Sequence, residues 1–391
     1  MWNMSLIASS EISNTTDASS SSAPQLLYAL RGTLALMITL GIIVSNVINV
    51  YIWHGNKQLP PAMRHFLLNL SCCDLLVGLV ATSSAVYPAF TGHWPFGSVW
   101  CQVSGVTHGM SVTLSIWTIA MIGVERYVAA VKPYKYKRIM SGQHSVYIIG
   151  GLWLAALLTY TTPLLTEPSF VYYHYSQREA MCGLYWKTAT YCVITAVYIP
   201  MLSAAILIFT SYKIRQHLLL PAARSVRGVA AKGLEMRRPS PRQLRSRTNS
   251  RALLILRATS ICFLISWGPY VTVTVLEQTI TRLRVPHWLS FALTWTANSN
   301  SLANFFIYSL TNKHFMKEAK RLLRQLSSCT SSSSSRQHSR INNIINNNNN
   351  NTMLGDQHIT LSHQPSCDVT SALHARVAEQ PQAYDDAAAT E

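Results

Sequence analysis

One carboxylate within an apolar stretch is the first feature of this sequence that could do chemistry. Asp74 is the only acidic residue found deep in such a stretch, where a lone charge is expensive and usually functional. Polar residues lie at comparable depth in other apolar stretches: Asn46, Ser115, Asn300, Ser301 and Asn304. Hard oxygen ligands around one carboxylate suit a small cation such as sodium, or a water cluster. The alternative is a protonated, hydrogen-bonded Asp74 that holds no ion.

A charged pair closes another apolar stretch. Cys101 opens this stretch and Glu125-Arg126-Tyr127 ends it, about 37 Å further along a helix that rises about 1.5 Å per residue. An arginine at this depth needs water or a partner. Glu125 supplies a local counter-charge, and a conformational switch could free the Arg126 guanidinium for the carbonyl groups of a partner. The simpler interpretation is an Arg126 side chain that extends to the membrane surface.

A proline beside a large aromatic residue predicts a hinge. Ser266-Trp267-Gly268-Pro269 places a proline inside a helix, where it removes one backbone hydrogen bond and bends the helix. A ligand in contact with Trp267 could bias that bend. No pairing of a nucleophile with a base, and no metal-ligand spacing, stands out within the apolar stretches, so the protein is not expected to be an enzyme.

These residues need apolar helices to position them. The chain has 391 residues, of which 49% are hydrophobic and 12% are charged, roughly half the charge of a soluble protein. Seven apolar stretches are long enough to cross about 30 Å of hydrocarbon: residues 26–53, 64–87, 98–131, 145–165, 187–212, 251–276 and 287–310. We therefore expect an all-α membrane protein, with a seven-transmembrane helix bundle over residues 26–312.

The basic residues predict the orientation of this bundle. About 27 of the 32 lysines and arginines flank the connections after the first, third and fifth helices or lie in the C-terminal tail. The positive-inside rule then places the N-terminus outside the cell and the tail in the cytoplasm. The net charge of +17 faces anionic membrane lipid or an acidic partner, and no nucleic-acid partner is expected.

Residues on the predicted outer side are open to oxidation and glycosylation. Cys101 and Cys182 are two thiols in an oxidising compartment, which could form a disulfide and pin a loop over the mouth of the bundle. Two free thiols are the alternative. The extracellular tail, residues 1–25, shows no cleavable signal peptide and carries glycosylation sequons at Asn3 and Asn14.

The end of the chain separates into two parts. Residues 313–326 place apolar side chains at helical spacing opposite basic ones, which predicts a short amphipathic eighth helix on the inner leaflet. Cys329 is a candidate palmitoylation site, or an idle cytosolic thiol. Residues 327–391, with runs of serine and asparagine, have little to bury and are expected to form a disordered cytoplasmic tail.

Taken together, these residues resemble the rhodopsin-like, class A G protein-coupled receptors over residues 26–326. The motif residues in register are Asn46, Leu70 with Asp74, Trp94-Pro95-Phe96-Gly97 before Cys101, Glu125-Arg126-Tyr127, Trp153, Pro200, Phe263 with Trp267 and Pro269, Asn304 with Tyr308, and Phe315. Each is weak alone, but this order and spacing are very specific. The sixth and seventh helices also resemble a small orphan group, the vertebrate receptors numbered twenty-one and fifty-two, through stretches such as Arg257-Ala258-Thr259-Ser260.

The resemblance implies a plasma-membrane receptor with a role for each group of residues. The implied G protein contacts are Glu125, Arg126, Tyr127, Val131, Pro133 and Tyr134. The implied switch residues are Phe263, Trp267, Pro269 and Tyr308, and the implied ligand pocket includes His108, Val112, Trp267, Tyr270 and Trp295. Receptor kinases and arrestin are the implied partners of Ser327, Ser328 and residues 330–335.

Departures from the family pattern narrow the ligand. Amine receptors carry an aspartate where this chain has His108, so an ordinary biogenic-amine receptor is not expected. His108 is either a ligand contact or a packed, hydrogen-bonded histidine. The retinal-binding lysine of opsins is replaced by Asn298, which excludes an opsin. Asn304 is followed by Phe305 in place of the usual proline, so the usual distortion of that helix is in doubt.

Two departures bear on activity without ligand. Some relatives carry an acid at the foot of helix six that holds Arg126 in the off state, and this chain has Asn249 there, which favours ligand-independent signalling. A tyrosine that partners Arg126 in the active state is replaced by Ile208, which argues the other way.

The sequence therefore predicts an orphan receptor of this family. It would transmit an extracellular signal, or its own basal activity, to heterotrimeric G proteins, with the stimulatory, cyclic-AMP-raising class implied by the orphan group. A receptor for an amine-like or other small molecule is one alternative. A transporter or channel is another, but no inverted repeat is visible and Asp74 lacks a second buried charge. The extracellular ligand is unknown, and no cofactor apart from sodium is expected.

Overall fold

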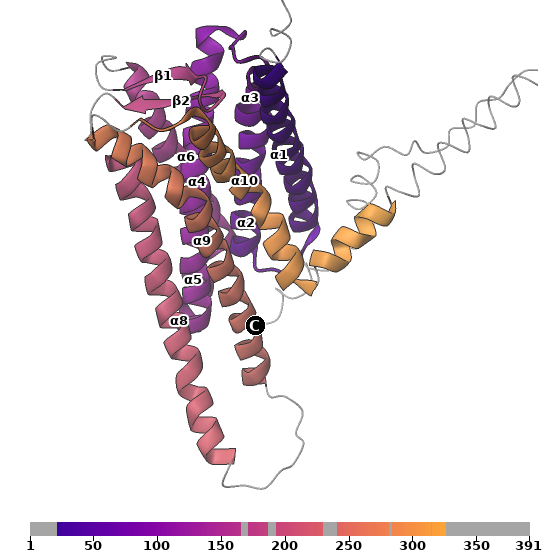
Figure 1. Cartoon of the computed structure of the whole chain (residues 1–391). Coiled ribbons are helices and arrows are strands. Elements are labelled where there is room, and N and C mark those ends of the chain that lie inside the picture. The colour runs from indigo at the N-terminus through magenta and orange to yellow at the C-terminus, as the bar shows by residue number, and fades with distance from the viewer. Residues whose placement is uncertain are drawn as a thin grey trace, which may run out of the picture. The chain divides into compact units, whose positions relative to one another are not determined.

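Figure 1 shows the computed structural model of the chain, which describes residues 22–165, 171–186, 193–229, 241–280, 284–313 and 315–325. The side chains from 218 to 253, and a few others, lie outside this description. The chain divides into two units, Met1–Met316 and Lys317–Glu391. The helix bundle lies in the first unit.

Within the described residues, seven long helical segments form the bundle. They are α1 (Ser22–Gly55); α2 (Pro61–Leu76), which continues through the π-helical η1 (Val77–Thr82) into α3 (Ser83–Thr91); α4 (Gly97–Val131); α6 (Gly142–Leu165); η3 (Val193–Tyr198) with α8 (Ile199–Val229); α9 (Pro241–Thr279); and α10 (His287–Thr311). Two short helical turns, η2 (Pro133–Lys135) and α5 (Tyr136–Ile139), follow α4. Six of the seven predicted stretches fall inside these segments, and the described part of the fifth lies in η3 and α8.

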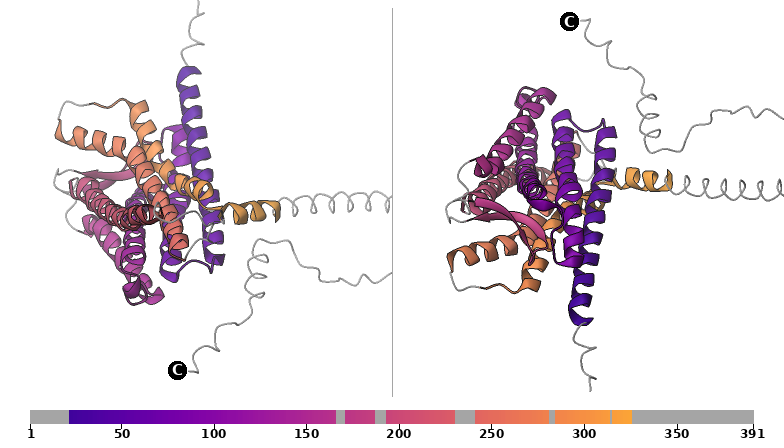
Figure 2. Two further views of the ribbon diagram at one scale, coloured as in Figure 1. Left: turned by 90° about the horizontal axis from the view of Figure 1, so that it is seen from below. Right: turned by 90° about the horizontal axis from the view of Figure 1, so that it is seen from above.

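Helix α4 is the central helix of the bundle. It contacts α2, α6, α8 and α9, whereas α1 packs against α2, α3 and α10. Figure 2 shows the helices of the bundle end on. Because α4 carries Cys101 near one end and Arg126 near the other, it connects the two ends of the bundle.

The second helical segment shows how local sequence sets its course. Pro61 occupies the first turn of α2, where a missing backbone N–H is not needed. The wide turn of η1 begins three residues after Asp74. The segment ends at Gly92, whose left-handed φ of +76° suits glycine, and whose N–H donates to the Pro88 carbonyl oxygen at 2.8 Å.

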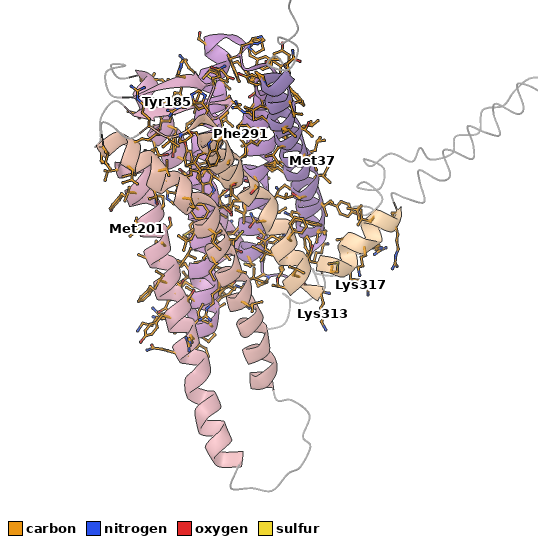
Figure 3. The ribbon with its side chains drawn as sticks, in the orientation of Figure 1. Met37, Tyr185, Met201, Phe291, Lys313 and Lys317 are labelled. Atoms are coloured by element: carbon orange, nitrogen blue, oxygen red, sulfur yellow. A yellow bond between two sulfur atoms is a disulfide. The ribbon has the colours of Figure 1, made fainter. Side chains whose placement is uncertain are left out.

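The outer faces of the helices are apolar, as a lipid solvent requires. Met37 of α1 and Met201 of α8 point away from the bundle (Figure 3) and are 67% and 64% exposed. Five described helices are long and apolar enough to cross a membrane: Pro24–Gly55, Pro61–Thr91, Gly97–Val131, Gly142–Thr162 and Arg257–Glu277. Helix α10 is not among these five. Its mean hydropathy is lower because it carries several buried amide side chains, among them Asn298, Asn300 and Asn304.

A two-stranded hairpin, which the sequence analysis did not anticipate, covers one end of the bundle. Strand β1 (Val171–Ser176) pairs antiparallel with β2 (Met181–Trp186), with Tyr175 opposite Cys182. The turn between them contains Ala180 at φ 60°. We call this end of the bundle the hairpin end, and the opposite end, near the last turns of α4, the Arg126 end.

Small residues let the helices approach closely. Ala35, Ala81, Ala85 and Ala89 form a buried cluster with Phe291 and Trp295, the kind of packing that membrane helices favour. At Gly109 of α4 an added Cβ would lie 2.4 Å from the ring of Tyr160. Glycine is therefore required there for α4 and α6 to pack as they do.

Residues 315–325 are helical, and they fall within the predicted eighth helix. Its amphipathic docking on a membrane remains a prediction. The predicted extracellular tail, residues 1–25, lies outside the described residues up to residue 21, and the predicted cytoplasmic tail, residues 327–391, lies outside them entirely.

Candidate functional site

Asp74 lies at the centre of a hydrogen-bonded cluster that joins three helices. Its Oδ1 accepts hydrogen bonds from Ser115 Oγ at 3.2 Å and from Ser301 Oγ at 2.9 Å. Its Oδ2 accepts one from Asn304 Nδ2 at 2.8 Å. Asp74 is 1% exposed, so these donors from α4 and α10 replace water around the carboxylate.

Asn46 extends the cluster to α1. Its Nδ2 donates to the backbone oxygens of Ser301 at 2.9 Å and Ile42 at 3.0 Å. Its Oδ1 accepts from Asn49 Nδ2 at 3.1 Å. Asn300, which was predicted to belong to this group, is buried on α10, but no hydrogen bond between described residues joins it to Asp74.

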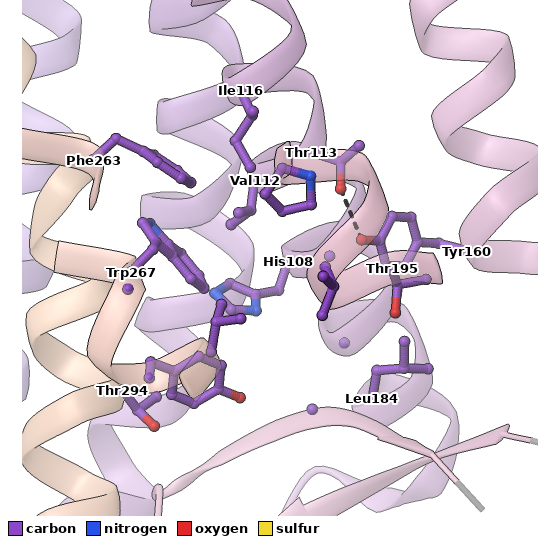
Figure 4. Close-up of a pocket in the computed structure, with 18 of the residues that line it drawn as sticks. His108, Val112, Thr113, Ile116, Tyr160, Leu184, Thr195, Phe263, Trp267 and Thr294 are labelled. Carbon is purple, nitrogen blue, oxygen red and sulfur yellow. Dashed lines mark hydrogen bonds between the residues drawn. The ribbon is translucent and has the colours of Figure 1, made fainter. Parts of the chain in front are cut away.

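A cavity of about 290 Å³ lies beneath the hairpin, between α4, α8 and α9. Four of the five residues expected in a ligand pocket line it: His108, Val112, Trp267 and Tyr270. Figure 4 shows His108, Val112 and Trp267 around this space. Most lining residues are apolar with a few polar groups, which is the usual composition of a small-molecule site.

His108 connects the cavity to α10. Asn298 Nδ2 donates to the Thr294 carbonyl oxygen at 2.9 Å, so Asn298 Oδ1 is the acceptor and His108 Nε2 donates to it at 2.8 Å. His108 is thus a packed, hydrogen-bonded histidine that also lines the cavity.

Aromatic rings on α9 continue from His108. The centroid of the Trp267 ring lies 6.1 Å from that of His108 and 6.2 Å from that of Phe263, on which it stacks. Tyr270 meets Trp267 edge to face at 5.8 Å. Pro269 lies inside α9 between these rings in sequence. A group that enters the cavity therefore contacts the segment of α9 that contains the proline.

Trp295 corrects the sequence prediction, because it does not line this cavity. It is 1% exposed and packs against Phe291, with ring centroids 5.7 Å apart. Its Nε1 donates to the Glu179 carbonyl oxygen at 3.1 Å. Trp295 therefore supports the turn of the hairpin.

The hairpin turn is fixed from several sides. Arg31 of α1 donates through Nη2 to the carbonyl oxygens of Gln177 at 2.8 Å and Arg178 at 3.0 Å. Arg178 forms a 3.0 Å ion pair with Glu277 of α9. Cys182 forms a disulfide with Cys101 of α4, with Cα atoms 5.4 Å apart. The two thiols therefore do not remain free.

At the Arg126 end, one buried carboxylate serves two donors. Glu125 is 0% exposed, and Arg126, whose side chain is 13% exposed, is ion-paired with it. The Tyr136 hydroxyl from α5 donates to Glu125 Oε1 at 2.5 Å. Burial, followed by the charge of Glu125, raises the pKa of Tyr136 above its ordinary value, so the hydroxyl remains a donor at physiological pH.

The other residues expected to contact a G protein surround this pair. Tyr127 and Val131 pack with the buried residues Ala130 and Ile214. Pro133 and Tyr134 lie in η2, and Tyr134 is 100% exposed. A partner at this end would therefore meet the exposed Tyr134 side chain near the Glu125–Arg126 ion pair.

Tyr308 lies apart from the other predicted switch residues. It is 3% exposed and packs edge to face on Trp53 of α1, with ring centroids 5.2 Å apart. Its ring also lies 5.8 Å from that of Phe315. Phe263, Trp267 and Pro269 instead lie on α9 near the cavity, so the switch residues form two separate groups.

Several predicted modification sites cannot be placed. Asn3, Asn14, Cys329 and the serines of the tail lie outside the described residues. So does the side chain of Asn249.

Sequence reasoning missed three residues that the structure brings into these sites. Asn298 entered the sequence analysis only as the position at which opsins carry a lysine. Thr294, Asn298 and Ser301 nevertheless recur at helical spacing and so predict one polar face. Tyr136 and Glu179 carried no such signal, because their contacts depend on loops that fold back over the bundle.

Comparison with known proteins points to receptors throughout. Residues 45–308 match the family model described as 7 transmembrane receptor (rhodopsin family). Melatonin receptor type 1A of Phodopus sungorus is 26% identical over 303 residues, which cover 76% of this chain and 82% of that receptor. Probable G-protein coupled receptor 21 of Homo sapiens is 27% identical over 351 residues, 82% of this chain and 94% of that protein. Neuropeptide FF receptor 2 of Mus musculus is 25% identical over 306 residues, 72% of this chain and 69% of that receptor.

Proposed function

The chain belongs to the rhodopsin family of seven-transmembrane receptors, and we propose that it relays a signal from the hairpin end of its bundle to a stimulatory G protein at the Arg126 end. As a class A receptor it is a multi-pass protein of the plasma membrane that signals through heterotrimeric G proteins. It is not an enzyme, and the alternative of a transporter or channel has no support.

The observation that carries this proposal is that two helices link the cavity with the polar cluster. On α10, Asn298 accepts from His108 in the cavity, and Ser301, one turn further along, donates to Asp74. On α4, His108 is followed two turns later by Ser115, which also donates to Asp74. A ligand that displaces α10 relative to α4 would therefore disturb both sites, which suits a population shift between two packings of the bundle.

Two observations support an orientation with the hairpin end outside the cell. The Cys101–Cys182 disulfide lies at that end, and disulfides form in oxidising compartments. Most lysines and arginines lie in the connections of the opposite end or in the tail. The N-terminal tail would then be extracellular, with Asn3 and Asn14 open to glycosylation. The C-terminal tail would be open to receptor kinases and arrestin, and Cys329 to palmitoylation near the lipid surface.

Signalling without ligand is supported by how little holds Arg126. Among the side chains that the structure describes, its hydrogen bonds go to Glu125 alone, on its own helix. Ile208, at the position of an active-state tyrosine, argues the other way, and its side chain is 71% exposed. The assignment to the stimulatory class rests on the resemblance of the sixth and seventh helices to the orphan group numbered twenty-one and fifty-two.

The cluster around Asp74 fits a sodium ion as an allosteric modulator. The Asp74 carboxylate and the Ser115 and Ser301 hydroxyls are hard oxygen donors within one buried site, which is the donor set that small cations prefer. A sodium ion there would place its charge between α2, α4 and α10, and so would favour the packing in which these helices remain together.

The test is cyclic AMP in cells that express the chain without added ligand. Vector alone, the parent chain, Arg126→Ala and a control, Arg138→Ala, are compared at equal surface level. Arg138 is an exposed basic residue of α5 at the same end. We expect the parent and the control to raise cyclic AMP above vector and Arg126→Ala to lose the rise. No rise in the parent would leave the family assignment in place and refute both the basal activity and the stimulatory coupling.

A further inference from the structure

Two cavities at the hairpin end share a wall. The inner cavity, of about 290 Å³, lies above Trp267, and an outer one of about 590 Å³ lies between the hairpin turn and the ends of α9 and α10. Glu179, Leu184 and Tyr270 line both cavities. Glu179, in the hairpin turn, therefore lies where the inner cavity meets the more polar outer one.

The Glu179 carboxylate has no partner in the part of the chain that the structure describes. It takes part in no ion pair there, since the neighbouring Arg178 is paired with Glu277 at 3.0 Å. Among the described residues that line the inner cavity, Glu179 is the only one of the Asp, Glu, Lys and Arg types. A carboxylate in such surroundings is unfavourable unless a cation or hydrogen-bond donors satisfy it.

The backbone around Glu179 is held before any ligand arrives. Its N–H donates to Ser176 Oγ at 3.4 Å, and its carbonyl oxygen accepts from Trp295 Nε1 at 3.1 Å. The N–H of the next residue, Ala180, donates to the Ser176 carbonyl oxygen at 2.7 Å. The Cys182 disulfide follows three residues after Glu179. The position of this carboxylate is thus set by the fold, which is the preorganisation expected of a binding group.

We propose that the ligand of this receptor carries a cationic group, an amine or a guanidinium, that pairs with Glu179, and an apolar body that fills the cavity between α4, α8 and α9. This inference rests on the proposed receptor function. The acid would lie elsewhere than in amine receptors, which carry it at the position of His108 on α4. Here His108 is bonded to Asn298, and the hairpin turn supplies the carboxylate instead.

Burial raises the pKa of Glu179 to about 7, while Arg178 lowers it and Glu277 raises it further. Among the described residues, the other ionisable groups around the outer cavity are Tyr185, Tyr270, Arg284 and His287, and those around the inner one are His108, Tyr160 and Tyr270. The carboxyl loses its charge as the pH falls through about 7. A cation should therefore bind more strongly at pH 8 than at pH 6.

The test measures this preference with a probe that needs no known ligand. A reporter cysteine is placed by Val271→Cys on α9, which lines the inner cavity. The purified full-length receptor reacts with 2-aminoethyl methanethiosulfonate, which is cationic, or with its neutral 2-hydroxyethyl analogue. Mass spectrometry of the reporter peptide gives both rate constants, and their ratio cancels the ionisation of the thiol itself.

The charge of Glu179 is then varied in this background. For an assumed separation of about 8 Å and an assumed effective dielectric constant of about 40, losing one charge in Glu179→Gln lowers the cation-to-neutral ratio about fivefold at pH 8. Two control variants should give a cation-to-neutral ratio within about twofold of the parent ratio. Glu179→Asp keeps the charge, and Glu318→Gln removes a charge from a residue that lines neither cavity. The parent ratio should fall between pH 8 and pH 6, and that of Glu179→Gln should not.

A ratio that Glu179→Gln leaves unchanged, or that Glu179→Asp lowers equally, overturns the proposal. Because labelling needs a folded receptor but no G protein, this result is independent of the cyclic AMP assay. A failed coupling experiment would therefore leave the cation site standing, and the reverse also holds.

Discussion

Tyr136 gives the sharpest test of how the Arg126 end is held. In the structure its hydroxyl and the Arg126 guanidinium share the Glu125 carboxylate, which is 0% exposed. In the proposed mechanism Arg126 leaves Glu125 to contact a G protein, and Tyr136 is then the donor that stays with the buried charge. Replacing Tyr136 by phenylalanine should therefore disfavour the released state more than the held state, and so lower signalling without ligand.

The size of the effect follows from what each state loses. A hydrogen bond to a charged group contributes about 1.5–3 kcal/mol, and a buried charge left without donors loses most of it. In the held state Arg126 still satisfies Glu125, so we take the difference between the two states as about 1 kcal/mol. Because 1.4 kcal/mol corresponds to a factor of ten, the ratio of active to inactive receptor should fall about fivefold.

The assay is G protein activation in living cells without ligand, at matched surface expression. Tyr147→Phe is the control, since it removes the same hydroxyl from a side chain of α6 that is 73% exposed and is not among the expected G protein contacts. In a Glu125→Gln background the effect of Tyr136→Phe should largely disappear, because no buried charge remains to be satisfied. Higher basal signalling in Tyr136→Phe, or an equal drop in both backgrounds, would refute the shared-carboxylate argument.

Three further outcomes test other parts of the structure. Cys182→Ser opens a bridge to Cys101 across 81 residues, worth about 4.5 kcal/mol by chain entropy, so flow cytometry should show little receptor at the cell surface. Exchanging sodium for N-methylglucamine should lower the free energy of unfolding of the purified parent by about 1.4 kcal/mol if the sodium concentration is near ten times its Kd. The stability of Asp74→Asn, which keeps the geometry but loses the charge, should not depend on sodium. Trp295→Phe removes a hydrogen bond to the hairpin turn worth about 1 kcal/mol, lowering Tm by about 2–4 °C, whereas Trp288→Phe, 65% exposed, should leave Tm unchanged.

The helices were predictable because a membrane demands long apolar stretches, and those stretches are visible without knowledge of their neighbours. The hairpin was not, although residues 171–175 read Val-Tyr-Tyr-His-Tyr, which favours a strand. A strand in a loop needs a pairing partner, and that partner follows after a turn with Ala180 in the left-handed region, a conformation that the sequence does not announce.

The residues around Asp74 likewise include some that the sequence predicts and one that it predicts wrongly. Asp74, Ser301 and Asn304 were predicted because polar groups at membrane depth are conspicuous one at a time. Asn300 has the same depth but lies next to Ser301 on the helix, about 100° around its axis, and the hydrogen bonds to Asp74 come from its neighbours. Depth can be read from sequence, whereas the direction in which a side chain points depends on how the helices rotate against one another.

During synthesis of this protein, Arg31 is made well before the residues that accept its hydrogen bonds. Its guanidinium donates to carbonyl groups 146 and 147 residues further along the chain. At about 5–20 residues per second, a ribosome needs about 7–30 s to make those partners. During that interval the first helix lies in the membrane with an arginine whose final hydrogen bonds do not yet exist. Factors that shield polar groups of newly inserted helices should therefore matter more for the yield of this chain than for that of an Arg31→Leu variant.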